Sequence, residues 1–119
     1  MPKTFKVIRL TQLKEMGLGD DFVKEISETF ISEIPKYLKN LDEAFTLNDK
    51  ASLRRIMHSL KPHSQTLGMS ELNKKLTYWE ENITDSDLSQ FKPDLLYIKQ
   101  NWNDAINDLK SLEDGRQLL

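Results

Sequence analysis

The sequence predicts an all-α protein, an antiparallel bundle of four helices. Apolar residues recur at steps of three and four along almost the whole chain, which is the spacing of one face of a helix. The segments that break this period hold residues that start or end helices, namely aspartate, serine, asparagine and glycine. The strand-like alternation at Phe5, Val7 and Ile8 is short and finds no second strand. Short connections between four amphipathic helices make neighbouring helices antiparallel.

Length and composition narrow the class of protein. With 119 residues, the chain is long enough for one domain with one core, so we expect a single domain over residues 1–119. Its 17 Lys+Arg nearly balance 19 Asp+Glu, and this weak net charge does not favour nucleic acid or an anionic membrane surface. The absence of cysteine excludes disulfides, thiolate metal sites and thiol nucleophiles. Without an apolar run of about 20 residues or a signal peptide, we expect a cytoplasmic protein with no membrane partner, acting as a monomer.

The first long helix is expected to begin after Gly17 and Gly19, where Asp20 or Asp21 can cap it. Pro35 lies inside its apolar pattern, so we expect a kink there with the helix continuing beyond it. The residues expected to face the core are Phe22, Ile26, Phe30, Ile34, Leu38, Leu41 and Phe45.

The second helix is expected to follow the break at Leu47-Asn48-Asp49, with Asp49 as its cap. Gly68 is expected to end it. Its inward face would hold Leu53, Ile56, Met57, Leu60, Ser64 and Leu67.

Ser70 is expected to open the third helix, and the polar stretch from Asn82 to Ser89 to form the longest loop. The fourth helix follows this loop, with Pro93 tolerated in its first turn. The inward residues of these two helices are expected to be Leu72, Leu76, Trp79, Ile83, Phe91, Leu95, Ile98, Trp102, Ile106 and Leu109.

The four predicted helices form a bundle over about residues 20–112. Residues 1–19 are expected to cover one end of it, with a short helix or extension at Thr11–Met16. Residues 113–119 are expected to form a tail that has no capping residues.

Both histidines of the chain lie in the second predicted helix, and His58 points away from its apolar face. Alone, an exposed histidine is most simply a surface residue without a role. However, Arg54, Lys61 and Gln65 fall within a narrow arc around His58. Such a basic, polar face is either simply solvated or suited to an anion. A phosphoryl group on a ring nitrogen is the anion that a histidine can itself carry.

The chemistry of phosphoryl transfer suits this arrangement. An unprotonated imidazole can attack phosphorus without a dedicated base. The loose transition state spreads charge over the equatorial oxygens, and Lys61 is placed to neutralise it. In the hairpin of the second and third helices, Glu80 falls at a similar height to His58. Glu80 is therefore either a hydrogen-bond partner that orients the His58 ring or a solvated residue beside Glu81.

The chain resembles histidine-containing phosphotransfer (Hpt) domains, whose signature is H-x-L-K-G-[SA]-[SA]-x-x-L-G, in His58-Ser59-Leu60-Lys61, Ser64 and Leu67-Gly68. The resemblance extends over nearly the whole chain, because the proline-containing first helix and the boundary at Asn48-Asp49 also fit the family. It implies that His58 accepts a phosphoryl group through Nε2 and that Lys61 stabilises this group. It also implies a carrier without ATP-dependent kinase activity and without a cofactor of its own.

The same resemblance implies the partners. The domain would take the phosphoryl group from an aspartate on the receiver domain of a response regulator or a hybrid histidine kinase. It would pass the group to another receiver aspartate, and the receiver would supply Mg²⁺. The receiver is expected to dock on Arg54, Lys61, Pro62 and Gln65 around His58.

Two positions depart from the signature: Pro62 replaces a glycine and His63 replaces a small residue. Pro62 frees the carbonyl of His58 from its helical hydrogen bond, so we expect a modest kink and an altered partner surface. His63 lies about 140° around the helix from His58. We therefore expect it to be a partly buried residue at the edge of the apolar face, and we expect no metal site.

Two other functions remain open from the sequence. The bundle can be an adaptor that is not phosphorylated and binds a receiver or a partner helix through an apolar groove, an alternative that Pro62 supports. A hydrolase or metalloenzyme fits less well, because such sites need converging polar groups in a concave surface.

Overall fold

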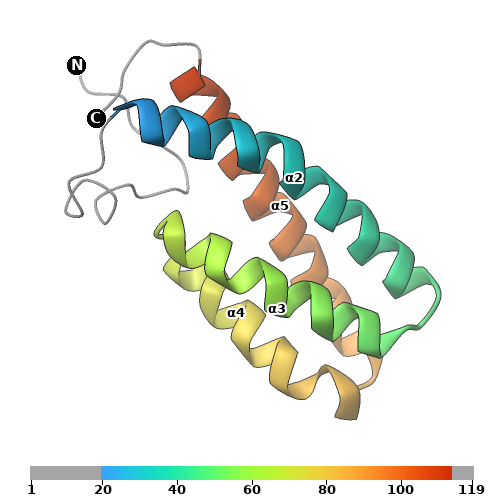
Figure 1. Cartoon of the computed structure of the whole chain (residues 1–119). Coiled ribbons are helices and arrows are strands. Elements are labelled where there is room, and N and C mark those ends of the chain that lie inside the picture. The colour runs from blue at the N-terminus through green and yellow to red at the C-terminus, as the bar shows by residue number, and fades with distance from the viewer. Residues whose placement is uncertain (1–19, 114–119) are drawn as a thin grey trace.

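The described chain is an antiparallel bundle of four long helices (Figure 1), which confirms the predicted all-α class. The computed structural model describes the backbone of residues 20–113 and the side chains of residues 24–111. The predicted segment at Thr11–Met16 and residues 114–119 of the predicted tail lie outside this region. The elements are α2 (Asp20–Thr46), α3 (Lys50–Thr66), α4 (Ser70–Asn82), the short 3₁₀ turn η1 (Ile83–Asp85) and α5 (Leu88–Glu113).

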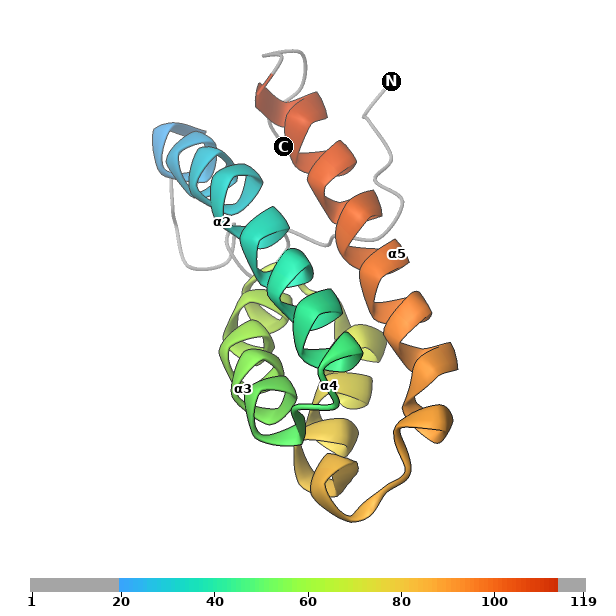
Figure 2. The ribbon, with the colours of Figure 1, turned by 90° about the vertical axis from the view of Figure 1, so that its right-hand side faces the viewer.

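Two helix pairs make up the bundle. Figures 1 and 2 show α2 lying along α5, and α3 lying along α4. α2 and α5 have 27 and 26 residues, whereas α3 and α4 have 17 and 13. The long pair therefore continues past the hairpin of α3 and α4 at one end of the molecule.

The α2–α3 and α3–α4 turns have the same backbone geometry. Asn48 and Gly68 adopt left-handed φ values of 56° and 67°, a conformation that glycine and asparagine tolerate best. The next amide, of Asp49 or Met69, donates to a carbonyl five residues earlier at 2.8 and 2.9 Å. Asp49 also caps α3 as predicted, because its carboxylate accepts the backbone N–H of Ser52 at 3.1 Å. These turns fix the register of α3, which carries both histidines.

The core lies between the four helices, and most residues predicted to face it are buried. Ile26, Phe45 and Ile56 are only half-buried and pack against its edge, and the side chain of Phe22 is outside the described region. Ser64 is fully buried, as predicted. The largest fully buried side chains are Trp102, Phe91, Ile34, Leu41, Leu53, Met57, Leu60, Leu67, Leu72, Leu76 and Ile83.

The connection between α4 and α5 differs from the prediction. The expected loop from Asn82 to Ser89 is largely helical, because η1 follows α4 directly and α5 begins at Leu88. The carboxylate of Asp87 accepts the backbone N–H of Ser89 at 2.9 Å and so caps α5 early. Pro93 consequently lies in the second turn of α5, and its predicted place in the first turn is wrong. The other internal proline of the long pair, Pro35, lies within α2, which continues to Thr46 as predicted.

Candidate functional site

His58 lies on the outer face of α3. Its side chain is 75% exposed, while the opposite face of the helix packs into the core through Leu53, Met57, Leu60 and Ser64. The amphipathic pattern of the helix therefore holds the imidazole outward on a rigid support.

Glu80 of α4 bridges His58 and Lys61. Its Oε1 atom contacts Nδ1 of His58, and its Oε2 atom accepts a hydrogen bond from Nζ of Lys61 at 3.1 Å. The side chains of Glu80 and Lys61 are 12% and 29% exposed. Of the two alternatives for Glu80, the structure shows the contact with His58. It also shows that Lys61 is half-buried and paired with Glu80, a pairing that was not predicted from the sequence.

The electrostatics of Glu80 determine which His58 nitrogen carries the proton. Partial burial raises the pKa of Glu80, but the hydrogen bonds from His58 and Lys61 and the charge of Lys61 outweigh it, so the pKa lies below the ordinary value of 4.5. Glu80 is therefore ionised at neutral pH, and an ionised carboxylate can only accept hydrogen bonds. Nδ1 of His58 must then be the donor, and in the neutral ring the lone pair remains on Nε2.

The other residues predicted to bind a partner lie around this group. Arg54, Pro62 and Gln65 are exposed on α3, and Arg55 beside them donates to Oγ of Ser52 at 2.9 Å. No group of three or more potential metal ligands occurs among the described residues. The outer face of α3 thus presents an imidazole among cations. The imidazole can act as a nucleophile, and the cations favour an electrophile that is an anion.

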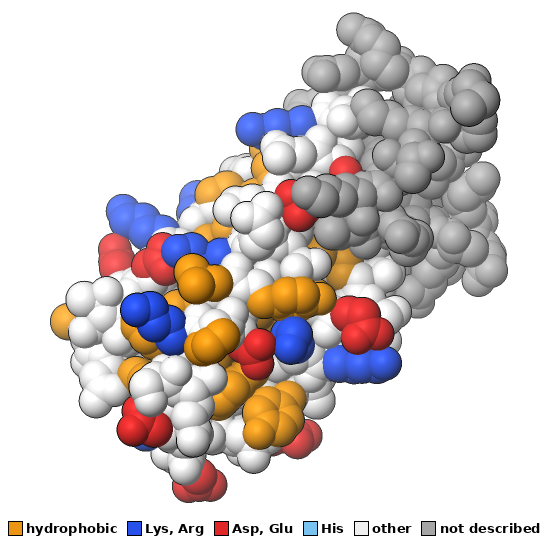
Figure 3. Space-filling model, turned by 180° about the vertical axis from the view of Figure 1, so that it is seen from behind, with side chains coloured by type: hydrophobic (Ala, Val, Ile, Leu, Met, Phe, Trp, Pro, Cys, Tyr) orange, Lys and Arg blue, Asp and Glu red, His pale blue; other side chains and the backbone are white. Residues whose placement is uncertain are grey.

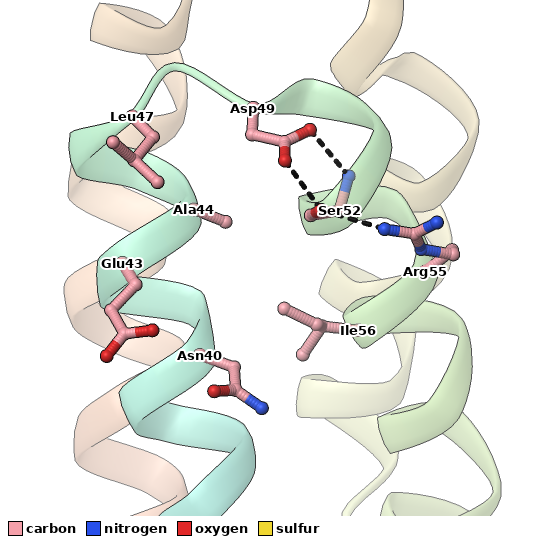
Figure 4. A pocket seen from close by; sticks show the side chains of 8 residues that line it. All are labelled: Asn40, Glu43, Ala44, Leu47, Asp49, Ser52, Arg55 and Ile56. Carbon is pink, nitrogen blue, oxygen red and sulfur yellow. Dashed lines mark hydrogen bonds between the residues drawn. The ribbon is translucent and has the colours of Figure 1, made fainter.

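Two hollows of the surface are separate from His58. One, of about 300 Å³, lies between α2 and α3 beside their turn (Figure 4), and its lining includes Ala44 of α2 and Ile56 of α3. The other, of about 340 Å³, adjoins the turn between α3 and α4. Figure 3 shows the back of the molecule, where apolar, basic and acidic side chains are interspersed and no histidine is visible.

Comparison with known proteins gives the family. The family described as Hpt domain matches residues 25–112, which is most of the chain and includes all the helices that form the site. The chain belongs to the Hpt domain family. Membership implies histidine phosphotransfer in phosphorelays, with receivers as interaction partners and a carrier role rather than that of a kinase. No curated protein and no solved structure matches the chain.

The second histidine of this Hpt domain, His63, faces α2, whereas His58 points to solvent. His63 is half-buried between Phe30 and Tyr37, with ring centroids 5.0 and 5.8 Å from its own. Burial lowers the pKa of His63, and the nearby charge of Glu33 partly opposes this effect. The position agrees with the predicted edge of the apolar face and gives His63 a packing role between two helices.

Asn73 is a residue of the site region that the sequence did not single out. Its side-chain amide donates to the carbonyl of Lys61 at 3.1 Å and to Oγ of Ser64 at 2.9 Å. Asn73 lies seven residues before Glu80, so both occupy one face of α4. That spacing was the available signal, but it does not reveal which atoms of α3 the amide meets.

Across residues 20–113, no helix combines the length and apolarity needed to cross a bilayer.

Proposed function

We propose that this Hpt domain carries a phosphoryl group on Nε2 of His58, taking it from one receiver aspartate and delivering it to another. The observation that carries the proposal is the bond between Nδ1 of His58 and the ionised Glu80. It favours the neutral tautomer with a lone pair on Nε2, while the ring remains 75% exposed to an incoming partner.

The transfer step forms one bond and breaks one bond. The lone pair of Nε2 attacks the phosphorus of an aspartyl phosphate, an N–P bond forms, and the P–O bond to the aspartate breaks. The aspartate carboxylate leaves with the electron pair, and the Nδ1 proton stays between His58 and Glu80. The negative charge of Glu80 compensates the positive charge that develops on the ring, and the reverse step regenerates the free imidazole.

Lys61 supplies the compensating charge for the phosphoryl oxygens. Its ammonium is held by Glu80 at 3.1 Å, and its side chain is 29% exposed. A lysine side chain is long and flexible, so the ammonium can contact a phosphoryl group on the adjacent ring. Because transfer proceeds through a loose transition state, such positioned charge contributes most of the stabilisation.

The docking surface for the receiver is the exposed face of α3 with Arg54, Pro62 and Gln65. Cations on this face complement the acidic site of a receiver, which binds the Mg²⁺ that neutralises phosphoryl oxygens during transfer. Contacts must be small and short-lived, because a carrier releases each partner after transfer. We expect response regulators and a hybrid histidine kinase as partners, and a monomeric cytoplasmic carrier that has no cofactor and does not use ATP.

A labelling experiment tests the proposal. A panel of receiver domains, each phosphorylated with labelled phosphate, is mixed with the wild-type chain, with His58→Gln and with His63→Gln as the matched control. We expect acid-labile, alkali-stable label on the wild type and on His63→Gln, and none on His58→Gln. Label that persists on His58→Gln refutes the assignment. Stoichiometric binding of a receiver with no label transferred supports the adaptor alternative instead.

A further inference from the structure

Pro62 creates a structural problem beside the candidate phosphoacceptor. Proline has no N–H, so Pro62 leaves the carbonyl of His58 without its usual helical donor. Its ring also disfavours the helical conformation of the preceding residue, Lys61. Nevertheless α3 continues through Pro62 to Thr66. Lys61 therefore keeps a helical backbone against the preference that Pro62 imposes on it.

The carbonyl of Lys61 receives two hydrogen bonds from side chains. Oγ of Ser64 donates to it at 2.7 Å, and Nδ2 of Asn73 donates to it at 3.1 Å. The same Asn73 amide donates to Oγ of Ser64 at 2.9 Å, and Ser64 is fully buried. The three groups form a closed, partly buried network, in which hydrogen bonds hold their geometry better than on the open surface.

This network joins α4 to α3 at the same residue that Glu80 contacts. Asn73 binds the main chain of Lys61, and Glu80 binds its side chain at 3.1 Å. The backbone of Lys61 sets the direction in which its own side chain leaves the helix. The carbonyl that Pro62 leaves without a helical donor is that of His58, one turn earlier. Both residues must be held for the Glu80 carboxylate to contact them at once.

We propose that Asn73 is a positioning residue of the phosphotransfer site: its amide holds the carbonyl of Lys61 against the distortion by Pro62 and so keeps His58 and Lys61 on Glu80. This role rests on the proposed function, because the site that Asn73 positions is a phosphotransfer site only if His58 carries the phosphoryl group. Asn73 acts only through Lys61 and contacts neither the phosphoryl group nor the receiver in this proposal. Asn73 is needed because of Pro62, which is one of the two positions at which this chain departs from the family signature.

The test uses the tautomer of His58, which NMR of the ring nitrogens reports without any partner or phosphate. The variants are Asn73→Leu, which removes the amide, and Asn73→Asp, which keeps the shape and replaces the donor by an acceptor. The matched control is Asn101→Leu in α5, whose part-buried amide donates at 3.0 Å to a carbonyl of its own helix. Circular dichroism and thermal melting establish that each variant is folded.

In the wild type, the form protonated on Nδ1 is expected to dominate. Either Asn73 variant should lower the ratio of this form to the Nε2-protonated form about fivefold, the equivalent of one neutral hydrogen bond. Asn101→Leu should leave the ratio unchanged. A folded Asn73 variant with the wild-type ratio overturns the proposal.

Coupling to Pro62 separates positioning from general support of the fold. Pro62→Ala restores the missing N–H and removes the constraint on Lys61, so Asn73→Leu should change the ratio much less in that background. An Asn73 effect of equal size with and without Pro62 contradicts the proposal. In the wild type itself, the side-chain amide hydrogens of Asn73 should exchange with solvent more slowly than those of the exposed Asn103. Equal exchange rates would also overturn it.

The outcomes distinguish this inference from the proposed function. If the tautomer responds to Asn73 as expected but no receiver labels His58, the positioning network stands and the phosphotransfer function fails. If His58 is labelled but neither the tautomer nor the transfer rate responds to Asn73, the function stands and the positioning role fails.

Discussion

Glu80 and His58 are 22 residues apart in the chain and are joined across two helices by the bond between Oε1 and Nδ1. The second oxygen of the same carboxylate holds Lys61 at 3.1 Å. One partly buried carboxylate therefore orients the ring, favours one tautomer and holds the nearest cation. The chemical behaviour of the exposed imidazole depends on a residue that is itself only 12% exposed.

Replacing Glu80 by glutamine should slow phosphotransfer while the fold is kept. The amide oxygen can still accept from Nδ1, but it carries no charge to compensate the ring during transfer. We expect the single-turnover rate with a phosphorylated receiver to fall about tenfold or more. Glu81→Gln, on the neighbouring exposed acid, is the control and should transfer at the wild-type rate. A wild-type rate in Glu80→Gln would show that Glu80 does not act on the ring.

Lys61→Met should reduce the rate of transfer more than it reduces binding of the receiver. The methionine retains most of the apolar stem but removes the charge that faces the phosphoryl oxygens in the transition state. We expect about a hundredfold lower rate with a small change in affinity, measured by rapid-mixing kinetics. Lys74→Met is a matched control, because Lys74 is exposed and pairs only with Glu71 of its own helix at 3.3 Å among the described contacts. Equal rates for the two variants would count against Lys61.

Because of His63, the free energy of unfolding should decrease as the pH is lowered. Burial lowers the pKa of His63 below its ordinary value of 6.5. The unfolded state therefore binds the proton more readily, and stability is lost as pH falls through and below 6.5. His63→Phe, which keeps a ring beside Phe30 and Tyr37, should show a smaller decrease over the same range in urea unfolding. Parallel curves for the two proteins would refute this prediction.

The two sides of α3 should respond differently to substitution. Leu60 is fully buried, so Leu60→Ala should destabilise the protein by about 3 kcal/mol through the cavity it leaves. His58→Gln, on the exposed side, should change the free energy of unfolding by no more than about 0.5 kcal/mol. Chemical denaturation of both variants measures the difference. A large loss of stability in His58→Gln would mean that the histidine supports the fold.

The sequence predicted much of the fold because apolar periodicity and turn residues act locally. The positions that face the core and the helix ends near Asn48 and Gly68 can be predicted without knowing which helices pack together. The start of α5 was misplaced because polar residues suggest a loop, whereas Asp87 caps a helix there. Composition alone does not distinguish the two.

The site was predictable to a lesser extent. The outward direction of His58 follows from helix geometry, and the height of Glu80 follows from counting residues across the turn. The pairing of Lys61 and the bonds of Asn73 depend on how far α4 approaches α3, which is set by packing of the whole core. The sequence pattern alone does not predict the distance between α3 and α4.

The decisive measurement is which imidazole nitrogen carries phosphorus after transfer. After transfer from a phosphorylated receiver, NMR of the ¹⁵N-labelled protein shows which ring nitrogen carries phosphorus. We expect a single phosphohistidine, at Nε2 of His58, with Nδ1 still protonated and facing Glu80. Phosphorus on Nδ1 of His58 or on His63 would contradict it.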